Sequence, residues 1–378
     1  MAFEILPYDP ELDPAIASLQ THLWCGDTAR NAAYFRWKYL DNPYLGDVIL
    51  RLVRDGGRIV AMRGLFGSLW EVDEPGNHVV LPHADDFVVD PEYRNRGAAA
   101  RVMKQTIADA RDRGCPFAVS LSASPVTFVS SLAAGWKAAG RYDPVWRHSP
   151  RSAALQGLRD RLGSVRWLSR LRRVVAPTSI VNAASPANPF ARLDGGAARL
   201  PPTLSLERSA RPEEMAALVA RLPWDGRIRH VRSREYFEWR FRNPMHDYRF
   251  LYFVDDGGLR GYLVLQRSLS DRVDRARVNI ADEEANEPAV RAALLRAALD
   301  LGRFDRVQAW TSSLPEGSRS LLREWGFKPP ASNVLTRSGG LLVFRLGSGP
   351  APATWALGRR NLLSIADWDL RMADSMVA

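Results

Sequence analysis

A strand, a tight basic turn and a helix follow one another within residues 85–114, and this succession constrains the fold more than any other feature of the sequence. The apolar run Phe-Val-Val at 87–89 is typical of a buried strand, and Asp90-Pro91 ends it. Apolar residues then recur at nearly helical spacing from Val102 as far as Gly114, a natural C-terminal stop. The sequence therefore predicts a strand, a basic turn and a helix in this order.

The turn has the residue types of an anion-binding site. The first N–H groups of a helix have no intrahelical partner, and the helix dipole adds positive potential at the same point. Gly97 lets the backbone approach an anion without a Cβ in the way, Ala98 and Ala99 keep the approach open, and Arg94 and Arg96 add charge. An ordinary exposed turn with solvated arginines explains the same residues equally well at this point.

The spacing within this segment resembles the pyrophosphate-binding segment of the GNAT acyl-CoA N-acyltransferases. Arg94, Gly97 and Ala99 match that family's pattern Arg/Gln-x-x-Gly-x-Gly/Ala. Downstream, residues 117–122 are expected to form the next strand, and Ser-Leu-Ala-Ala-Gly-Trp at 131–136 resembles the family's helix that ends in Gly-Phe. The resemblance covers about residues 45 to 147. It implies that the strand before the turn pairs with the pantetheine arm of acetyl-CoA or another acyl-CoA, and that the turn amides hold the pyrophosphate. The implied cofactor-binding residues are Phe87, Val88, Val89, Arg94, Asn95, Arg96, Gly97, Ala98, Ala99 and Ser122.

The same resemblance directs attention to the strand before the turn for catalysis. Acyl transfer from a thioester to an amine needs a deprotonated amine, a polarised carbonyl and a proton for the leaving thiolate. In GNAT enzymes a Glu, Asp or ordered water on this strand often deprotonates the amine. The candidates on this strand here are His83, Asp85 and Asp86. Alternation puts His83 and Asp85 on one face and Asp86 on the other. The ordinary pKa of His83 suits a base near neutral pH, although a His beside two Asp residues is more often structural.

The proton donor is left open by the sequence. The family's usual tyrosine, four residues before the Gly-Phe of the final helix, falls at Ser131, which can orient a water but is a poor acid. Tyr142 and Tyr93 are substitutes only if the fold brings them close. Thiolate departure can also proceed without an acid.

The second half of the chain repeats the first. The segment Tyr-Phe-Arg-Trp-Lys-Tyr-Leu-Asp-Asn-Pro at 34–43 returns as Tyr-Phe-Glu-Trp-Arg-Phe-Arg-Asn-Pro at 236–244, and the Asp-Gly-Gly turn at 55–57 returns at 256–258. The offset of about 200 residues suits a duplicated domain rather than a solenoid repeat. We therefore predict an α/β (α+β) protein of two tandem GNAT folds, each with a mixed, mostly antiparallel central sheet flanked by helices.

The second copy differs where chemistry is expected. After a predicted strand at 276–281, the residues Asp-Glu-Glu-Ala-Asn-Glu-Pro at 282–288 lead into the next helix with neither glycine nor arginine. Acidic side chains in a turn would repel a pyrophosphate, so we expect this copy to keep the fold, to lack the cofactor site, and to shape the substrate cleft or stabilise the first copy. The predicted parts are an acyl-CoA-binding domain at 1–150, a basic helical connector and linker at 151–202, a degenerate C-terminal domain at 203–348 and a tail at 349–378 that docks back.

Composition narrows the function classes. The formal charge of +10 fits CoA, nucleotide sugars, nucleic acid or a membrane surface without choosing between them, and a basic pI inherited from an arginine-rich proteome is the favoured explanation. The amphipathic basic pattern at 151–174 favours a connector helix over a nucleic-acid or membrane-binding segment. Two cysteines argue against a disulfide framework and a Cys-rich metal site, so no metal is expected. No stretch is long and apolar enough for a transmembrane segment, and the acidic start of the chain predicts a cytoplasmic protein.

Together these features predict an acyl-CoA-dependent N-acyltransferase. It is expected to move an acetyl or other acyl group to the primary amine of a small molecule or amino sugar by direct attack. The repeated aromatic residues can stack on a sugar, though such a stripe is more often core. The rival hypothesis is a non-catalytic pair of GNAT folds that binds or scaffolds. The intact turn favours the enzyme, whereas the absent tyrosine keeps the rival hypothesis open. Nucleic acid is not an expected partner, an oligomer is compatible with the sequence, and the acceptor and acyl chain length are left open.

Overall fold

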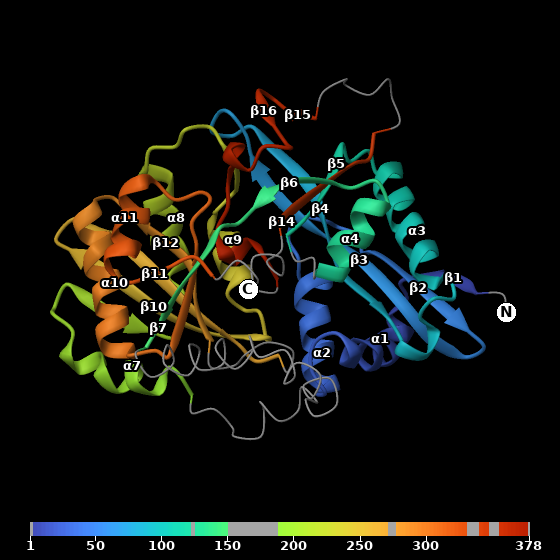
Figure 1. The fold of residues 1–378 in the computed structure, drawn as a ribbon, viewed down its shortest axis with the longest axis horizontal. Coiled ribbons are helices and arrows are strands. Elements are labelled where there is room, and N and C mark those ends of the chain that lie inside the picture. The colour runs from blue at the N-terminus through green and yellow to red at the C-terminus, as the bar shows by residue number, and fades with distance from the viewer. Residues whose placement is uncertain are drawn as a thin grey trace, which may run out of the picture.

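The computed structural model describes residues 3–121, 125–149, 188–270, 277–330, 340–347 and 355–376. Two units of similar architecture lie beside each other, the N-terminal one in blue to teal and the C-terminal one in yellow to orange (Figure 1). In the part of the chain that the structure describes, no helix is both long and apolar enough to cross a membrane. The predicted connector helix at 151–174 lies outside the described residues.

The first copy is a sheet covered by helices on both faces. Its elements are β1 (Glu4–Pro7), η1 (Pro10–Leu12), α1 (Asp13–Leu19), η2 (Gln20–His22), α2 (Thr28–Phe35), the π-helical η3 (Arg36–Leu40), β2 (Ile49–Asp55), β3 (Arg58–Glu71), β4 (His78–Val89), η4 (Pro91–Tyr93), α3 (Ala98–Asp112), β5 (Phe117–Ser120), α4 (Pro125–Ala133) and β6 (Lys137–Arg141). Successive strand residues point to opposite faces, so Met62 packs with α1 and α2 whereas Ala61 packs with α3. β3 is continuous from Arg58 to Glu71, and β4 pairs with it throughout the stretch from Phe66 to Leu69.

The second copy repeats this arrangement. It contains α7 (Ala191–Gly196), η5 (Ala197–Arg199), β8 (Leu204–Glu207), α8 (Pro212–Arg221), β9 (Ile228–His230), α9 (Arg234–Arg240), β10 (His246–Asp255), β11 (Gly258–Ser268), β12 (Arg277–Ala285), α10 (Pro288–Gly302), β13 (Arg306–Trp310) and α11 (Glu316–Glu324). Helices α8 and α9 pack on one face of its sheet, and α7, α10 and α11 pack on the other. Phe190 and Leu193 are part of this core. The region predicted as linker therefore includes an ordered helix of the second copy, because these two apolar side chains complete its core.

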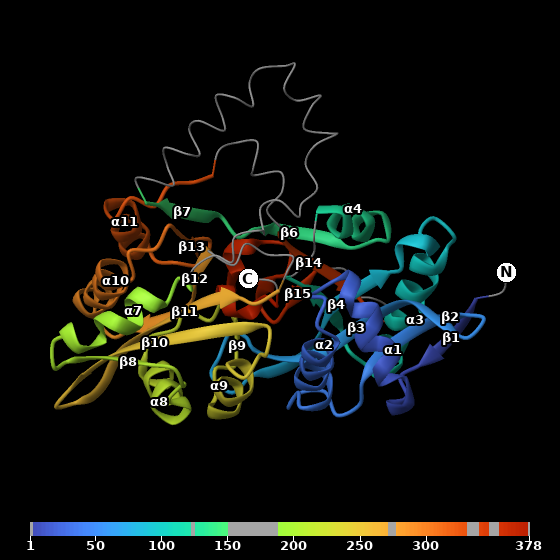
Figure 2. The same cartoon turned by 90° about the horizontal axis from the view of Figure 1, so that it is seen from below.

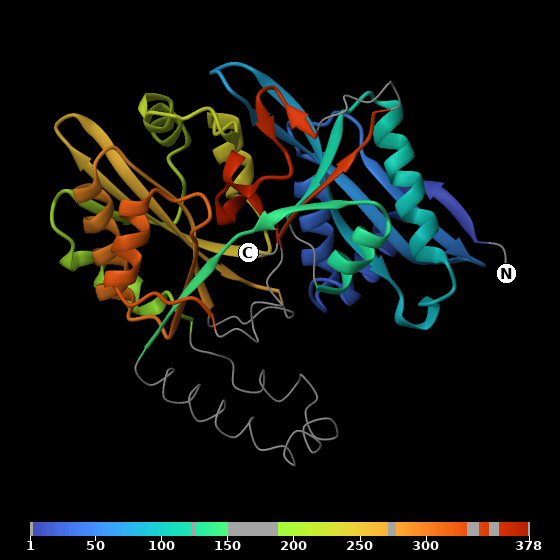
Figure 3. The ribbon, with the colours of Figure 1, turned by 45° about the horizontal axis from the view of Figure 1, so that its top comes forward.

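The two sheets exchange their last strands. β7 (Pro144–His148) comes from the first half of the chain but pairs with β13, and β14 (Gly340–Arg345) comes from the second half but lies between β5 and β6. The strand order is β1-β2-β3-β4-β5-β14-β6 in the first sheet and β7-β13-β12-β11-β10-β8 in the second. Figure 3 shows the green chain running from β6 in one unit to β7 in the other, and the red-orange β14 lying antiparallel to β6. The sheets thus do not follow the predicted domain boundaries at 150 and 348. The sequence did not predict this exchange because backbone pairing between distant strands has no signature in local composition.

The C-terminal tail, which the sequence predicts to dock back, lies between the two copies. Its elements are β15 (Ala356–Leu357), β16 (Arg360–Asn361), η6 (Ile365–Asp367), β17 (Trp368–Asp369) and η7 (Met372–Asp374). β17 pairs with β9, and β9 in turn pairs with the end of β3 in the first sheet. Trp368 is completely buried. The red tail accordingly lies between the two units in Figure 2.

The repeated aromatic segments meet at the centre of the molecule. The rings of Trp37 and Trp239 stack with centroids 4.9 Å apart and an interplanar angle of 9°. Each indole N–H donates a hydrogen bond to the other residue's carbonyl oxygen, at 2.6 Å from Trp37 and 2.8 Å from Trp239. A self-complementary contact of this kind is what an approximate two-fold relation between copies produces. The aromatic stripe is therefore buried core and inter-copy contact rather than an exposed surface for stacking sugars.

Candidate functional site

β4 and β5 diverge immediately after His83, and this divergence defines the candidate site. The two strands run parallel and pair only at His83 and Val119; β4 then continues to Val89 while β5 ends at Ser120. At the point of divergence the His83 Nε2 accepts a hydrogen bond from the Leu121 N–H at 3.1 Å. The backbone groups of β4 beyond this point that face β5 are left without a strand partner among the described residues.

His83 is held as a structural acceptor. Its side chain is fully buried and stacks on the Phe66 ring with centroids 4.4 Å apart. Burial, together with the positive charge of Lys38, lowers the pKa of His83 well below its ordinary value. The ring is therefore neutral at physiological pH, and its Nε2 is occupied by the Leu121 amide, which does not favour the predicted role as a base.

A β-bulge brings both aspartates to one cation. The register between β3 and β4 shifts by one residue between Met62 and Gly64, and Asp86 has a left-handed φ of +51°. As a result the Lys38 Nζ lies 2.6 Å from Asp85 Oδ2 and 3.2 Å from Asp86 Oδ1. The prediction that alternation sends Asp85 and Asp86 to opposite faces is wrong, because the extra residue of the bulge interrupts the period of two.

Lys38, Asp85 and Asp86 form a buried cluster with one positive charge for two carboxyl groups. The Lys38 and Asp86 side chains are inaccessible, whereas that of Asp85 is 9% exposed. The Trp24 indole N–H donates to Asp86 Oδ1 at 2.8 Å, and the Lys38 Nζ donates to the Tyr34 hydroxyl at 3.2 Å. Burial raises the pKa of Asp85; Lys38 opposes this effect and Asp86 adds to it. Asp85 is thus the cluster's accessible carboxyl group and holds a proton more readily than a free aspartate.

Lys38 was not expected from the sequence, although the repeat contained a signal for it. A basic residue stands at the same place in both aromatic segments, Lys38 in the first and Arg240 in the second, and both are buried. Arg240 binds the tail instead of strand carboxylates, donating to the carbonyl oxygens of Ala373 and, at 2.7 Å, Ser375. A charge inside an aromatic segment requires a buried partner, which is how this residue could have been found.

The predicted proton donors lie elsewhere. Ser131 is 2% exposed on α4, and its carbonyl accepts the Trp136 N–H at 3.1 Å; within the described ranges no hydrogen bond links its hydroxyl to the Lys38–Asp85–Asp86 cluster. The Tyr142 hydroxyl donates to the Leu121 carbonyl at 3.2 Å, and burial raises its pKa well above the ordinary value. Tyr142 therefore helps His83 to fix the end of β5. Ser122 lies outside the described residues.

The basic turn is open and preformed for an anion. Gly97 is the residue before α3 and has φ +86°. Among the described residues, a Cβ there would meet no atom within 4 Å and no side chain caps the helix. Arg94, Asn95 and Arg96 are exposed, and Asn95 also has a positive φ of +63°. Ala98 is buried beneath the turn. The first amides of α3 therefore face outward between arginines, an arrangement that fits a pyrophosphate.

The β4 residues that precede the turn alternate between two environments. Val88 packs in the core beneath α1 and α2, whereas Phe87 and Val89 pack on the α3 side. The predicted cofactor strand thus has its α3-facing side chains beside the turn.

The second copy has a much shorter connection at the equivalent place. Only Asn286 and Glu287 separate β12 from α10, whereas the residues from Asp90 to Gly97 separate β4 from α3. The sequence predicts a turn for the acidic residues 282–284, but they lie in strand β12. They can be buried there because arginines from other segments neutralise them.

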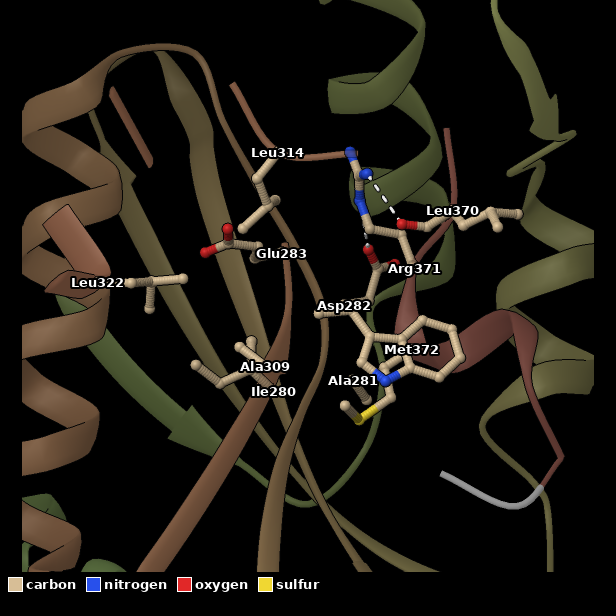
Figure 4. A pocket seen from close by; sticks show the side chains of 11 residues that line it. Ile280, Ala281, Asp282, Glu283, Ala309, Leu314, Leu322, Leu370, Arg371 and Met372 are labelled. Carbon is tan, nitrogen blue, oxygen red and sulfur yellow. Dashed lines mark hydrogen bonds and ion pairs between the residues drawn. The ribbon is translucent and has the colours of Figure 1, made fainter. Parts of the chain in front are cut away.

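Asp282 and Glu283 line a narrow hollow between β12 and β13. Figure 4 shows Glu283 on the side of Leu314 and Leu322, while Arg371 of the tail lies over Asp282. Glu284 is bound by Arg371 at 2.8 Å and by Arg232 at 2.6 Å. The tail residues 370–372 form one wall, so the tail partly occupies the place where this copy's strands diverge. No group of three or more His, Cys, Asp or Glu among the residues described could hold a metal ion.

Comparison with known proteins matches both copies. Residues 16–126 match the model of the acetyltransferase (GNAT) family, and residues 229–335 match that of an acetyltransferase (GNAT) domain. No curated protein sequence matches the chain.

Three solved structures share the fold over 92% of this chain. One is a conserved protein of unknown function from Enterococcus faecalis V583, described as a probable N-acyltransferase, with a TM-score of 0.55, 8% identity and 73% of that chain covered. The second is a GCN5-related N-acetyltransferase from Anabaena variabilis ATCC 29413, with a TM-score of 0.54, 13% identity and 73% of that chain covered. The third is a tandem GNAT protein from the clavulanic acid biosynthesis pathway, with a TM-score of 0.52, 14% identity and 99% of that chain covered. At these identities the likeness concerns the fold alone. With both halves matched by family models, the chain consists of two GNAT-family domains in tandem.

Proposed function

We propose that this protein is an acyl-CoA-dependent N-acyltransferase whose donor site and catalytic groups lie in the first copy. The observation that carries the proposal is the Lys38–Asp85–Asp86 cluster, which stands where β4 and β5 diverge and on the same strand that leads to the open basic turn. As acceptor we propose the primary amine of a small molecule or amino sugar, and as compartment the cytoplasm.

In this proposal the acyl-CoA donor binds at the basic turn and along the strand before it. Bound acyl-CoA would supply an activated acyl thioester. The α3 amides after Gly97, with Arg94 and Arg96, are suited to hold its pyrophosphate, and Asn95 shapes the turn through its positive φ. The unpaired backbone groups of Phe87, Val88 and Val89 are suited to pair with the pantetheine amides. Ala98 and Ala99 keep the approach to these amides open.

Asp85 is the general base of the proposed reaction. The amine nitrogen forms a bond to the thioester carbonyl carbon, the carbon–sulfur bond breaks, the amine proton passes to Asp85, and CoA departs as the thiolate. A raised pKa makes the Asp85 carboxylate a stronger base than a free aspartate, and its partial exposure gives the amine access. Asp86 and Lys38 act as positioning residues, since Trp24 and Tyr34 fix them by hydrogen bonds. His83 keeps β5 in place, and Ser131 retains the predicted part of orienting a water.

For the second copy we propose a structural role. Its short connection offers no turn for a pyrophosphate, and its strand carboxylates are bound by Arg232 and Arg371. The alternative hypothesis, a non-catalytic GNAT fold that binds or scaffolds, therefore applies to the second copy.

Thermal stabilisation by acetyl-CoA tests the donor site. We expect acetyl-CoA to raise the Tm of the wild type and not that of Gly97→Glu, because the new side chain adds bulk and negative charge at the turn. Gly114→Glu is the matched control: Gly114 also has a positive φ, +74°, and a Cβ added there would meet no atom within 4 Å, but it ends the same helix at the far side from the turn.

Stabilisation of wild type and Gly114→Glu alone would justify a screen of amines for CoA release. Absence of stabilisation in all three proteins would contradict the proposed donor site. Equal stabilisation of all three would move the site away from the turn.

A further inference from the structure

Arg63 of β3 is a buried arginine that forms no ion pair with any described residue. It is 3% exposed, and neither its Nε nor its Nη1 has a hydrogen-bond partner among the described residues. Its guanidinium lies instead over the rings of Phe87 and Trp136, 5.5 Å from each centroid. Burial lowers the pKa of Arg63 to about 10, so the group is still a cation at neutral pH.

The neighbouring arginine on the same face shows what the fold normally provides. Arg51 is the cross-strand partner of Arg63, and paired residues of antiparallel strands share a face. Its guanidinium binds Asp109 of α3 with two hydrogen bonds, at 2.6 and 2.8 Å. Arg51 is therefore neutralised within the protein, whereas the more deeply buried Arg63 is not.

The second copy shows that the fold does not need an arginine here. The β2–β3 hairpin closes at the pair Asp55 and Arg58, and the β10–β11 hairpin closes at Asp255 and Gly258. Five residues further along, Arg63 in β3 corresponds to Leu263 in β11, a fully buried core residue. Burying a cation that forms no ion pair costs stability, so packing alone does not account for Arg63.

Arg63 lies beside the proposed donor path. It stands opposite the bulge of β4, on the α3 side of the sheet, where Phe87 belongs to the strand that leads into the basic turn. Its other neighbour, Trp136, directly follows the turn at the end of α4. Asp85, the proposed base, is close enough for its charge to oppose the lowering of the Arg63 pKa.

We propose that Arg63 binds a carboxylate at the end of the donor's acyl group, so that the first copy selects a dicarboxylic acyl-CoA over acetyl-CoA. This inference rests on the proposed function and names its donor class. A guanidinium presents a planar fork of N–H donors that matches a carboxylate, and a buried cation is compensated by an anion more fully than by a neutral carbonyl. The transferred product would then be an amide that carries a free carboxylate.

Binding of succinyl-CoA and acetyl-CoA, measured by calorimetry, tests the inference. We expect the wild type to bind succinyl-CoA more tightly than acetyl-CoA. Arg63→Leu, which installs the residue of the second copy, should weaken succinyl-CoA binding by roughly 10- to 100-fold and acetyl-CoA binding by less than about three-fold. Arg51→Leu is the control, because it removes the same charge from the same face and should leave the preference intact. The Tm of each free variant establishes that it is folded.

Each other outcome overturns the inference in a distinct way. Equal weakening of both donors by Arg63→Leu would show that Arg63 contacts a part common to both, not the acyl end. Equal binding of the two donors to the wild type, unchanged in Arg63→Leu, would refute the selection while leaving the proposed donor site standing. Failure of the wild type to bind either donor would remove the donor site and this inference with it.

Discussion

The strand before the turn in the first copy and its counterpart in the second differ in how their carboxyl groups are neutralised. Both strands have an irregular register with their neighbour, next to Asp86 in β4 and next to Asp282 in β12. In the first copy one lysine serves two aspartates, and one of these reaches the surface. In the second, Arg232 and Arg371 surround the acidic residues, and the tail covers them.

This difference separates chemistry from stability within one fold. In the second copy Arg232 and Arg371 lower the pKa of Glu284 to about 2 despite its burial, so that Glu284 acts as an internal cross-link. Asp282 has a raised pKa, but it is completely buried and bound to Arg232. A cluster that is short of positive charge keeps one carboxyl group with a raised pKa, and such groups are found preferentially at functional sites. The tail is the element that covers the carboxyl groups of the second copy's strand.

We expect the largest effect on folding when the two copies are separated. A fragment of residues 1–150 lacks β14, so the first sheet loses the strand that joins β5 to β6. We expect this fragment to show no cooperative thermal unfolding by circular dichroism. Residues 1–141 joined through a flexible linker to 338–348 should recover cooperative unfolding, and a cooperative melt of the unsupplemented fragment would contradict the importance of the exchanged strand.

Equivalent carboxyl substitutions in the two copies test the contrast directly. Asp85→Asn should lower kcat/KM with an identified amine by about 10²- to 10⁴-fold while leaving donor binding unchanged, because the base is lost but the turn is not. Asp282→Asn should leave kcat/KM within about three-fold, since that carboxyl group is bound to Arg232 and the Tyr262 hydroxyl rather than to a substrate. Steady-state CoA release measures both, and comparable losses in the two variants would assign chemistry to the second copy.

The stacked tryptophans test whether the copies stabilise each other. Trp37→Ala should lower the free energy of unfolding by about 3–5 kcal/mol, because it removes a buried ring and leaves the Trp239 carbonyl without its donor. Trp239→Ala should have a similar effect by the approximate two-fold relation. The double variant should cost less than the sum, since both substitutions remove the same contact. Chemical denaturation of the three variants measures this, and strict additivity would show that the rings act independently.

The smallest effect is the pH dependence of the tail contacts. Burial raises the pKa of Asp282 and of Asp374 to about 6, whereas Arg232 and Arg371 help to lower the pKa of Glu284 to about 2 despite its burial. A raised folded-state pKa gives stability that is present below the ordinary aspartate value and is lost as the pH rises through about 6. The Asp282 and Asp374 contribution should therefore make the Tm a few degrees higher at pH 5 than at pH 7.5.

Asp374→Asn isolates this contribution. The Asn side chain does not titrate, so the difference in Tm between pH 5 and pH 7.5 should become smaller than in the wild type. Scanning calorimetry at both pH values measures the change. An unaltered difference would show that Asp374 is not the titrating group.

Features that depend on neighbouring residues could be predicted from the sequence. Gly97 at a left-handed position, the apolar period of α3 and the repeat with its Asp-Gly-Gly turns are local, and each predicted its element correctly. From these the tandem arrangement and the two sheets could be predicted, because backbone preference and side-chain period act over a few residues.

Features that depend on distant partners became visible only in the folded chain. The exchange of β7 and β14 is a matter of backbone pairing, which any strand of suitable pattern offers. The bulge at Asp86 reversed the expected facing of that residue, and the arginines around Asp282 turned a predicted loop into a strand. In each case a charge or an unpaired edge is too costly to bury alone, and the segment that compensates it is far away in the chain.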